Sequence, residues 1–119
     1  MKSFHNLQIW NKSHQLNLDL YKVTKSFSKE ELYGLTSQIR RAAASIPTNI
    51  AEGCGRAGDA DFRRFLIIAM GSASELEYLL LLARDLNFLA PEHYHKFFER
   101  LEEVKKMLAS LIKKLKADR

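Results

Sequence analysis

The chain has 119 residues, a net charge of +5 and a pI near 9.4, values that fit one globular domain spanning residues 1–119. Its single cysteine, Cys54, excludes an internal disulfide and favours a reducing, cytoplasmic compartment. The N-terminus lacks the apolar stretch of a signal peptide, and the longest apolar region, residues 65–82, contains Glu75 and Glu77, so we expect no membrane contact.

Two amphipathic helices are predicted in the N-terminal half. In residues 7–27 one stripe contains Ile9, Ser13, Leu16, Leu20, Val23 and Phe27. The second helix begins at residue 30 or 32 and ends at residue 52, with a stripe of Leu35, Ile39, Ala42, Ile46 and Ile50. Pro47 lies inside it and removes one backbone hydrogen bond, which predicts a kink. We expect Gly53 to end this helix in a left-handed conformation, and residues 53–58, which include Cys54, to form a loop.

Two further helices are predicted in the C-terminal half. The third begins with Asp59 as its N-cap and ends near residue 87, with a stripe of Phe62, Phe65, Ala69, Ala73, Leu76, Leu80 and Ala83. The fourth begins near Pro91 and carries a heptad-like seam of Tyr94, Phe97, Leu101, Val104, Leu108, Leu111 and Leu115. We place the aromatic rings of Trp10, Tyr21 and Tyr94 in the core. Four long helices with short connections predict an all-α, antiparallel up-down-up-down four-helix bundle.

The outer faces of the second and third helices predict a homo-oligomer. Opposite its core stripe the second helix carries small side chains, Ser37, Ala44, Ser45 and Thr48, which allow another helix to approach closely. The third helix has no charge in residues 65–74 and is apolar all round in residues 79–83. Self-association would cover these faces, whereas the alternative is that they fill a tight monomer core.

No residue pattern points to catalysis, a cofactor or a small-molecule substrate. Residues 53–58 read Gly-x-Gly-x-x-Gly, but a dinucleotide fingerprint needs a preceding strand, and here a helix precedes it. His93 and His95 point about 200° apart on a helix and do not converge on one metal ion. We therefore expect no enzyme and no metal, and an enzyme or metal protein is the third alternative.

A set of basic residues predicts a nucleic-acid interface. Six basic residues and one acid lie in residues 104–119, and other arginines lie on the second helix and around the predicted loop. The alternative is a solvated surface balanced by nearby acids, although symmetry in an oligomer would repeat and strengthen a weak patch. The candidates are Arg40, Arg41, Arg56, Arg63, Arg64, Lys105, Lys106, Lys113 and Lys116.

Four segments of the chain carry a family resemblance: residues 4–10, 33–42, 45–53 and 69–78. The most specific are Asn-Ile-Ala-Glu-Gly at residues 49–53 and Gly-Ser-Ala-Ser-Glu-Leu at residues 71–76. The chain resembles the four-helix bundle proteins encoded within intervening sequences of bacterial 23S ribosomal RNA genes. These are related to the accessory variability proteins of diversity-generating retroelements.

The resemblance implies a ring-like pentamer whose partners are structured RNA or a reverse transcriptase. It also implies structural or interface roles for Asn49, Glu52, Gly53 and Glu75, and it matches Arg40 and Arg41 to a basic pair of the family. Two functional hypotheses follow. The first is a non-enzymatic adaptor that binds RNA or a ribonucleoprotein, and the second is a protein-only interaction module or an intervening-sequence product without a nucleic-acid ligand.

Overall fold

The computed structural model describes the backbone of residues 3–117 and the side chains of residues 3–115, and this part of the chain is helical. Four α-helices are present, and short 3-10 helices precede α1 and α2. No strand occurs within residues 3–117, which confirms the all-α prediction. The elements are η1 (Phe4–Asn6), α1 (Gln8–Thr24), η2 (Lys29–Glu31), α2 (Leu35–Cys54), α3 (Asp59–Asp85) and α4 (Pro91–Ala117).

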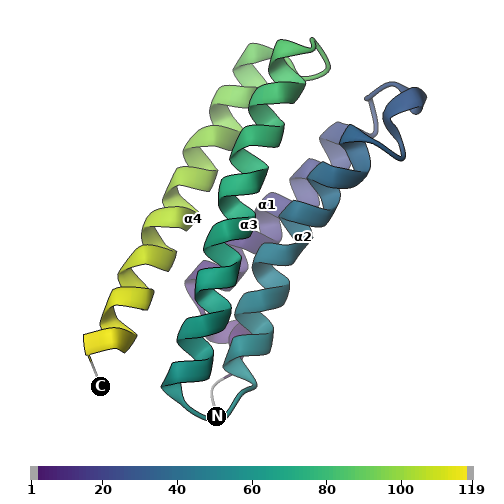
Figure 1. The fold of residues 1–119 in the computed structure, drawn as a ribbon. Coiled ribbons are helices and arrows are strands. Elements are labelled where there is room, and N and C mark those ends of the chain that lie inside the picture. The colour runs from purple at the N-terminus through teal and green to yellow at the C-terminus, as the bar shows by residue number, and fades with distance from the viewer. Residues whose placement is uncertain (1–2, 118–119) are drawn as a thin grey trace.

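The helices lie side by side in a long, narrow bundle that measures 46 × 22 × 20 Å (Figure 1). The most extensive contact joins α2 and α3; α3 also packs on α4, and α1 packs on α2 and touches α4. In Figure 1 the N-terminus, the α2–α3 connection and the C-terminus lie at one end of the bundle, and the α3–α4 connection lies at the other. Helices that follow one another in the chain therefore pack against one another, as short connections require.

The predicted stripes form the core. All five stripe residues of α2 are buried, and the seam of α4 buries Phe97, Leu101, Val104, Leu108 and Leu115. Four predicted residues pack against this core but stay partly exposed, namely Val23, Phe62, Tyr94 and Leu111. Because a fully buried leucine or isoleucine contributes roughly 1.5–3 kcal/mol, these stripes supply the main stabilisation of the bundle.

Polar side chains join α2 to α3 outside this core. The hydroxyl oxygens of Ser45 and Ser72 lie 2.7 Å apart in a part-buried hydrogen bond. Asn49 Nδ2 donates to the Ser45 carbonyl at 2.8 Å and to the Ser45 hydroxyl at 3.0 Å. The Ser45–Ser72 bond links α2 to α3, and Asn49, which bonds to Ser45 within α2, orients the Ser45 hydroxyl toward it.

The α2–α3 connection differs from its prediction. Helix α2 continues through Cys54, which is buried, so Gly53 is not a left-handed cap and Cys54 is not in the loop. Gly53 is instead a packing position, because a Cβ there would lie 2.9 Å from both Phe62 Cδ1 and Phe65 Cβ. The positive φ of 106° belongs to Gly58, which precedes α3, and Asp59 is the first residue of α3 rather than its N-cap.

Two helix ends also differ from prediction. Helix α2 begins at Leu35, because the preceding residues form η2 and the Glu31 carboxylate accepts a hydrogen bond from the Leu35 N–H at 3.1 Å. Helix α1 ends at Thr24, three residues before Phe27. Phe27 is still buried and stacks on Phe88, with 5.7 Å between the ring centroids. The hydrophobic pattern therefore located the core correctly where it misplaced the helix boundary.

Candidate nucleic-acid interface

Three of the nine candidate basic residues hold the bundle together. Arg40 joins α2 to α1, since its Nε donates to Thr24 Oγ1 at 2.9 Å and its Nη2 donates to the Tyr21 carbonyl at 3.2 Å. Arg63 joins α3 to α4 through a 3.3 Å bond to the Ile112 carbonyl. Lys105 joins the same two helices through a 2.7 Å ion pair with Glu77. Their side chains are committed to contacts within the chain.

Two more candidates lie beside the α2–α3 connection and are balanced by acids. The Arg56 guanidinium pairs with Glu52 at 2.7 Å, and that of Arg64 lies 3.6 Å from Asp61. Both guanidinium groups also lie over the ring of Phe65, at 5.0 and 4.6 Å from its centroid. Their charge is therefore partly compensated, although both side chains keep access to solvent.

The lysines near the end of α4 are exposed and lack such partners. Lys106 and Lys113 are exposed, and Lys114, which the sequence analysis did not select, is exposed beside them. Within residues 3–115 none of the three forms an ion pair. Of the two remaining candidates, Arg41 is exposed on α2, and Lys116 has a side chain outside the described residues.

Two of these lysines border a groove between α1 and α4 that we call the α1–α4 groove. It has a volume of about 400 Å³ and is lined by Gln8, Ile9, Lys106, Met107, Ser110, Leu111 and Lys114. An amide, a hydroxyl and two ammonium groups therefore surround an apolar floor. Such a set can donate hydrogen bonds to phosphate and sugar oxygens. The eight-residue spacing of Lys106 and Lys114, about two helical turns, was the sequence signal for their shared groove.

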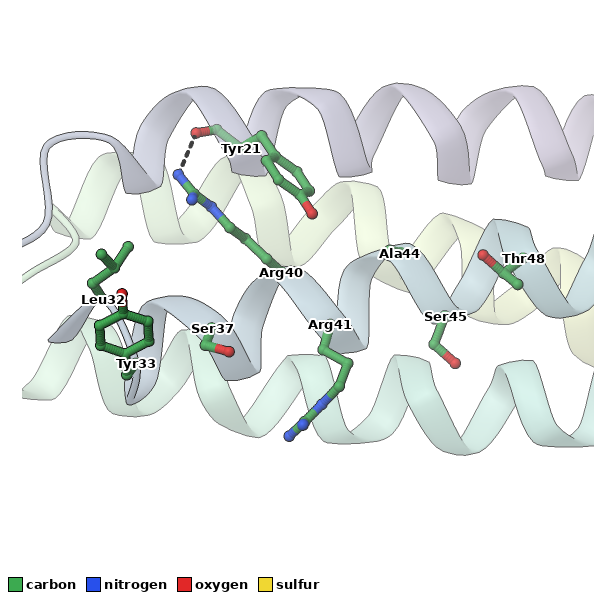
Figure 2. A pocket seen from close by; sticks show the side chains of 9 residues that line it. All are labelled: Tyr21, Leu32, Tyr33, Ser37, Arg40, Arg41, Ala44, Ser45 and Thr48. Atoms are coloured by element: carbon green, nitrogen blue, oxygen red, sulfur yellow. Dashed lines mark hydrogen bonds between the residues drawn. The ribbon is translucent and has the colours of Figure 1, made fainter.

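A second groove, the α2 groove, follows the outer face of α2. It has a volume of about 720 Å³ and is lined by Tyr21, Leu32, Tyr33, Ser37, Arg40, Arg41, Ala44, Ser45 and Thr48 (Figure 2). Ser37 and Thr48 are exposed and Ala44 and Ser45 partly so, and the Ser45 hydroxyl bonds to Ser72 on α3. Figure 2 shows Arg40 reaching toward Tyr21 on α1, whereas Arg41 points away from it.

Aromatic side chains border the α2 groove. Tyr33 is 93% exposed, and Tyr21 is 41% exposed, so the prediction that Tyr21 is a core residue is wrong. Its ring instead carries the Arg40 guanidinium, 4.8 Å from the ring centroid. Trp10 does pack against the core, stacked on His14 with 4.8 Å between the ring centroids.

Of the two predicted stretches on the outer face of α3, residues 65–74 carry large exposed apolar side chains and residues 79–83 do not. Leu79, Leu80 and Ala83 are buried by the chain's own core, so residues 79–83 are not open all round. The exposed apolar side chains lie nearer the N-terminus of α3 and include Ile67 and Ile68. By length and composition α3 passes the test for a membrane span, a test that the core helix of a soluble bundle also passes.

Comparison with known proteins places these features in a family. A family model described as 23S rRNA-intervening sequence protein matches residues 5–110. The chain belongs to this family. A crystal structure from Bacteroides thetaiotaomicron, described as a protein with unknown function from the S23 ribosomal protein family, is 30% identical with a TM-score of 0.80. The alignment covers 88% of this chain and 98% of that chain. None of the curated proteins matches the chain.

The residues of the 23S rRNA-intervening sequence protein motifs occupy distinct positions in this fold. Gly53 allows α3 to pack closely on α2, and Asn49 bonds within α2 to Ser45, whose hydroxyl reaches Ser72 on α3. Glu52 pairs with Arg56 on the surface of the same helix. Glu75 is exposed on α3 and forms no ion pair within residues 3–115. Glu75 is therefore a motif residue that the ion pairs within residues 3–115 leave unexplained.

The structure also bears on metal binding. Within the side chains described, no group of three or more His, Cys, Asp or Glu residues could hold a metal ion. His95 lies 3.6 Å from Glu99 on the exposed face of α4. The Gly-x-Gly-x-x-Gly segment connects two helices, since α2 ends at Cys54 and α3 begins at Asp59.

Proposed function

We propose that this 23S rRNA-intervening sequence protein is a non-enzymatic, homo-oligomeric adaptor that binds RNA or a ribonucleoprotein through the lysines of α4. Its subunits are antiparallel, up-down-up-down four-helix bundles, and the family resemblance favours a ring-like pentamer. The partner is structured RNA, alone or in complex with a protein such as a reverse transcriptase, and the setting is the cytoplasm.

The observation that carries this proposal is the set of exposed lysines on α4, two of which border the α1–α4 groove. Lys106, Lys113 and Lys114 have no ion pair within residues 3–115, so their ammonium groups remain available to phosphates. A lysine in the last turn of a helix, as Lys114 is in α4, also stabilises the helix through its dipole, by about 0.3–1 kcal/mol. Assembly multiplies the basic surface, because every subunit adds an identical set of α4 lysines.

The experiment is an RNA titration of the purified protein at about 50 and 200 mM salt, followed by fluorescence anisotropy. Binding through phosphates should weaken steeply over this range. The logarithm of the binding constant falls linearly with the logarithm of the salt concentration, with a slope of about −0.7 for each phosphate neutralised in single-stranded RNA. Reversing Lys106, Lys113 and Lys114 to glutamate should abolish binding at 200 mM salt.

A matched control reverses Lys22, Lys25 and Lys29, which are equally exposed. They follow one another through the end of α1 into η2, far in sequence from the lysines of α4. Both triple variants change the net charge by the same amount, so only a localised site separates them. Equal losses in the two variants would contradict a site on α4 and leave only a general charge effect.

A second candidate function is a protein-only interaction module. It is favoured by the commitment of Arg40, Arg63 and Lys105 to contacts within the chain and by the apolar outer face of α3. An assembled protein that binds no RNA at either salt concentration would select this second function over the first.

A further inference from the structure

A glycine in the middle of α3 has no explanation within the monomer. Gly71 lies near the centre of the 27-residue helix α3, where glycine costs about 0.5–1 kcal/mol relative to alanine. A Cβ at Gly71 would meet no atom within 4 Å, so nothing in the subunit requires its absence. Gly53 makes the contrast clear, because there the chain itself fills the space. A neighbour outside the subunit would supply a reason for a bare backbone at residue 71.

Gly71 lies on an exposed strip of α3 that we call the α3 ridge. Residues 67, 71, 74 and 78 step by four and three positions and so follow one line along the helix, with residues 68 and 75 beside them. Three large side chains of this strip are open to solvent: Ile67 is 46% exposed, Ile68 42% and Tyr78 59%. The α3 ridge contains Ile67, Ile68, Gly71, Ser74, Glu75 and Tyr78.

The α2 groove has the shape and charge that complement this ridge. Its central residues are small, so a second helix can approach its floor closely, and Tyr33 and Leu32 border it as exposed apolar walls. It presents the guanidinium of Arg41, and the ridge presents the carboxylate of Glu75. Within residues 3–115 neither of these exposed groups forms an ion pair.

We propose that the α3 ridge of one copy docks into the α2 groove of a second copy, with Glu75 of the ridge facing Arg41 of the groove. The contact is head-to-tail, because ridge and groove are different surfaces, and such contacts generate closed rings when the rotation permits. Gly71 lets the two backbones approach, and the isoleucines of the ridge are covered. This inference rests on the assembly in the proposed function and names the surfaces that make it.

The test measures the molecular mass of Arg41→Glu, of Glu75→Arg and of their equimolar mixture, without RNA, by sedimentation velocity. The parent should exceed the 13.7 kDa of one chain. Each single variant should need about tenfold more protein to associate, because it places like charges opposite each other. The mixture should associate at lower concentration than either variant alone, since the glutamate at position 41 of one variant then meets the arginine at position 75 of the other. A five-membered ring still keeps one like-charged contact, so association of the mixture, rather than the full parent mass, is the expected result.

Mixing the two variants restores a contact between subunits but not an ion pair within one subunit, because in each variant the residues at positions 41 and 75 carry the same charge. A Gly71→Leu variant provides a second measurement, because its side chain enters open space in the monomer but blocks the ridge. It should fold with unchanged circular dichroism and remain monomeric. Lys25→Glu, a reversal at an exposed lysine outside both surfaces, should assemble like the parent.

Three results would each overturn the inference: a monomeric parent, single variants that assemble normally, or a mixture that stays monomeric. A monomeric parent would also remove the assembly from the proposed function, whereas the dependence of RNA binding on the α4 lysines would still be measurable. A failed RNA titration leaves these masses unaffected, so the two failures are distinguishable.

Discussion

The same chemical change, glycine to alanine, should have opposite effects at two positions of this bundle. At Gly53 the new methyl carbon would lie 2.9 Å from carbons of Phe62 and Phe65, well inside the 3.5–4.0 Å at which carbons attract. Overpacking of this kind costs about 1–3 kcal/mol, and the better helix propensity of alanine returns about 0.5–1 kcal/mol. We therefore expect Gly53→Ala to lower the free energy of unfolding by about 1–2 kcal/mol.

At Gly71 the methyl group would enter open space, so only the propensity term remains, and Gly71→Ala should raise the free energy of unfolding by about 0.5–1 kcal/mol. Urea unfolding followed by circular dichroism should separate the two midpoints by about 1 M for a slope near 2 kcal/mol/M. Measurements at two protein concentrations, tenfold apart, identify any contribution from assembly. A Gly53→Ala variant as stable as Gly71→Ala would refute the close α2–α3 packing on which the reasoning depends.

Two further predictions concern contacts between helices. Arg40→Ala should destabilise the bundle by about 1–2 kcal/mol, because Arg40 donates two charged hydrogen bonds to α1, whereas Arg41→Ala should change the monomer's stability by less than about 0.5 kcal/mol. Thermal unfolding of both variants checks this, and equal losses would contradict it. A double-mutant cycle on Ser45 and Ser72, each replaced by alanine, should give a coupling of about 0.5–1.5 kcal/mol in urea unfolding; no coupling would show that their hydroxyls do not interact.

The core was predictable because helical periodicity reports burial directly. The stripe of α2, from Leu35 to Ile50, was predicted in full, since each step of three or four residues returns to the same side of the helix. The helix ends were less predictable because they depend on local hydrogen bonds and on tertiary contacts. Gly53 has the spacing of a helix terminator, yet Phe62 and Phe65 pack against it and α2 continues past it.

The sequence predicted which basic residues the candidate site contains. It did not predict which of their side chains bond within the chain and which stay exposed. Arg40 and Arg41 are adjacent and chemically identical in the sequence, but α1 captures the first and leaves the second exposed. Lys105 and Lys106 divide in the same way, since Glu77 on α3 pairs only with Lys105. Such divisions depend on which neighbouring helix supplies an acceptor, information that one helix's own periodicity does not contain.

Assembly and RNA binding can be separated by a variant that gains positive charge while it loses the interface. Glu75→Arg raises the net charge from +5 to +7 and leaves the lysines of α4 intact. If each subunit bound RNA independently, the added charge should strengthen binding slightly. If binding depends on several lysine sets acting together, loss of assembly should weaken it by about 10²-fold or more.

The RNA titration at about 50 mM salt decides between these outcomes, because the two hypotheses predict changes of opposite sign. Mixing Glu75→Arg with Arg41→Glu should restore association and most of the lost affinity, which excludes a folding defect as the cause of the loss. Tighter binding by monomeric Glu75→Arg would show that one subunit carries the whole site. The small residues of α2 and the glycine of α3 would then serve an assembly with a purpose separate from RNA.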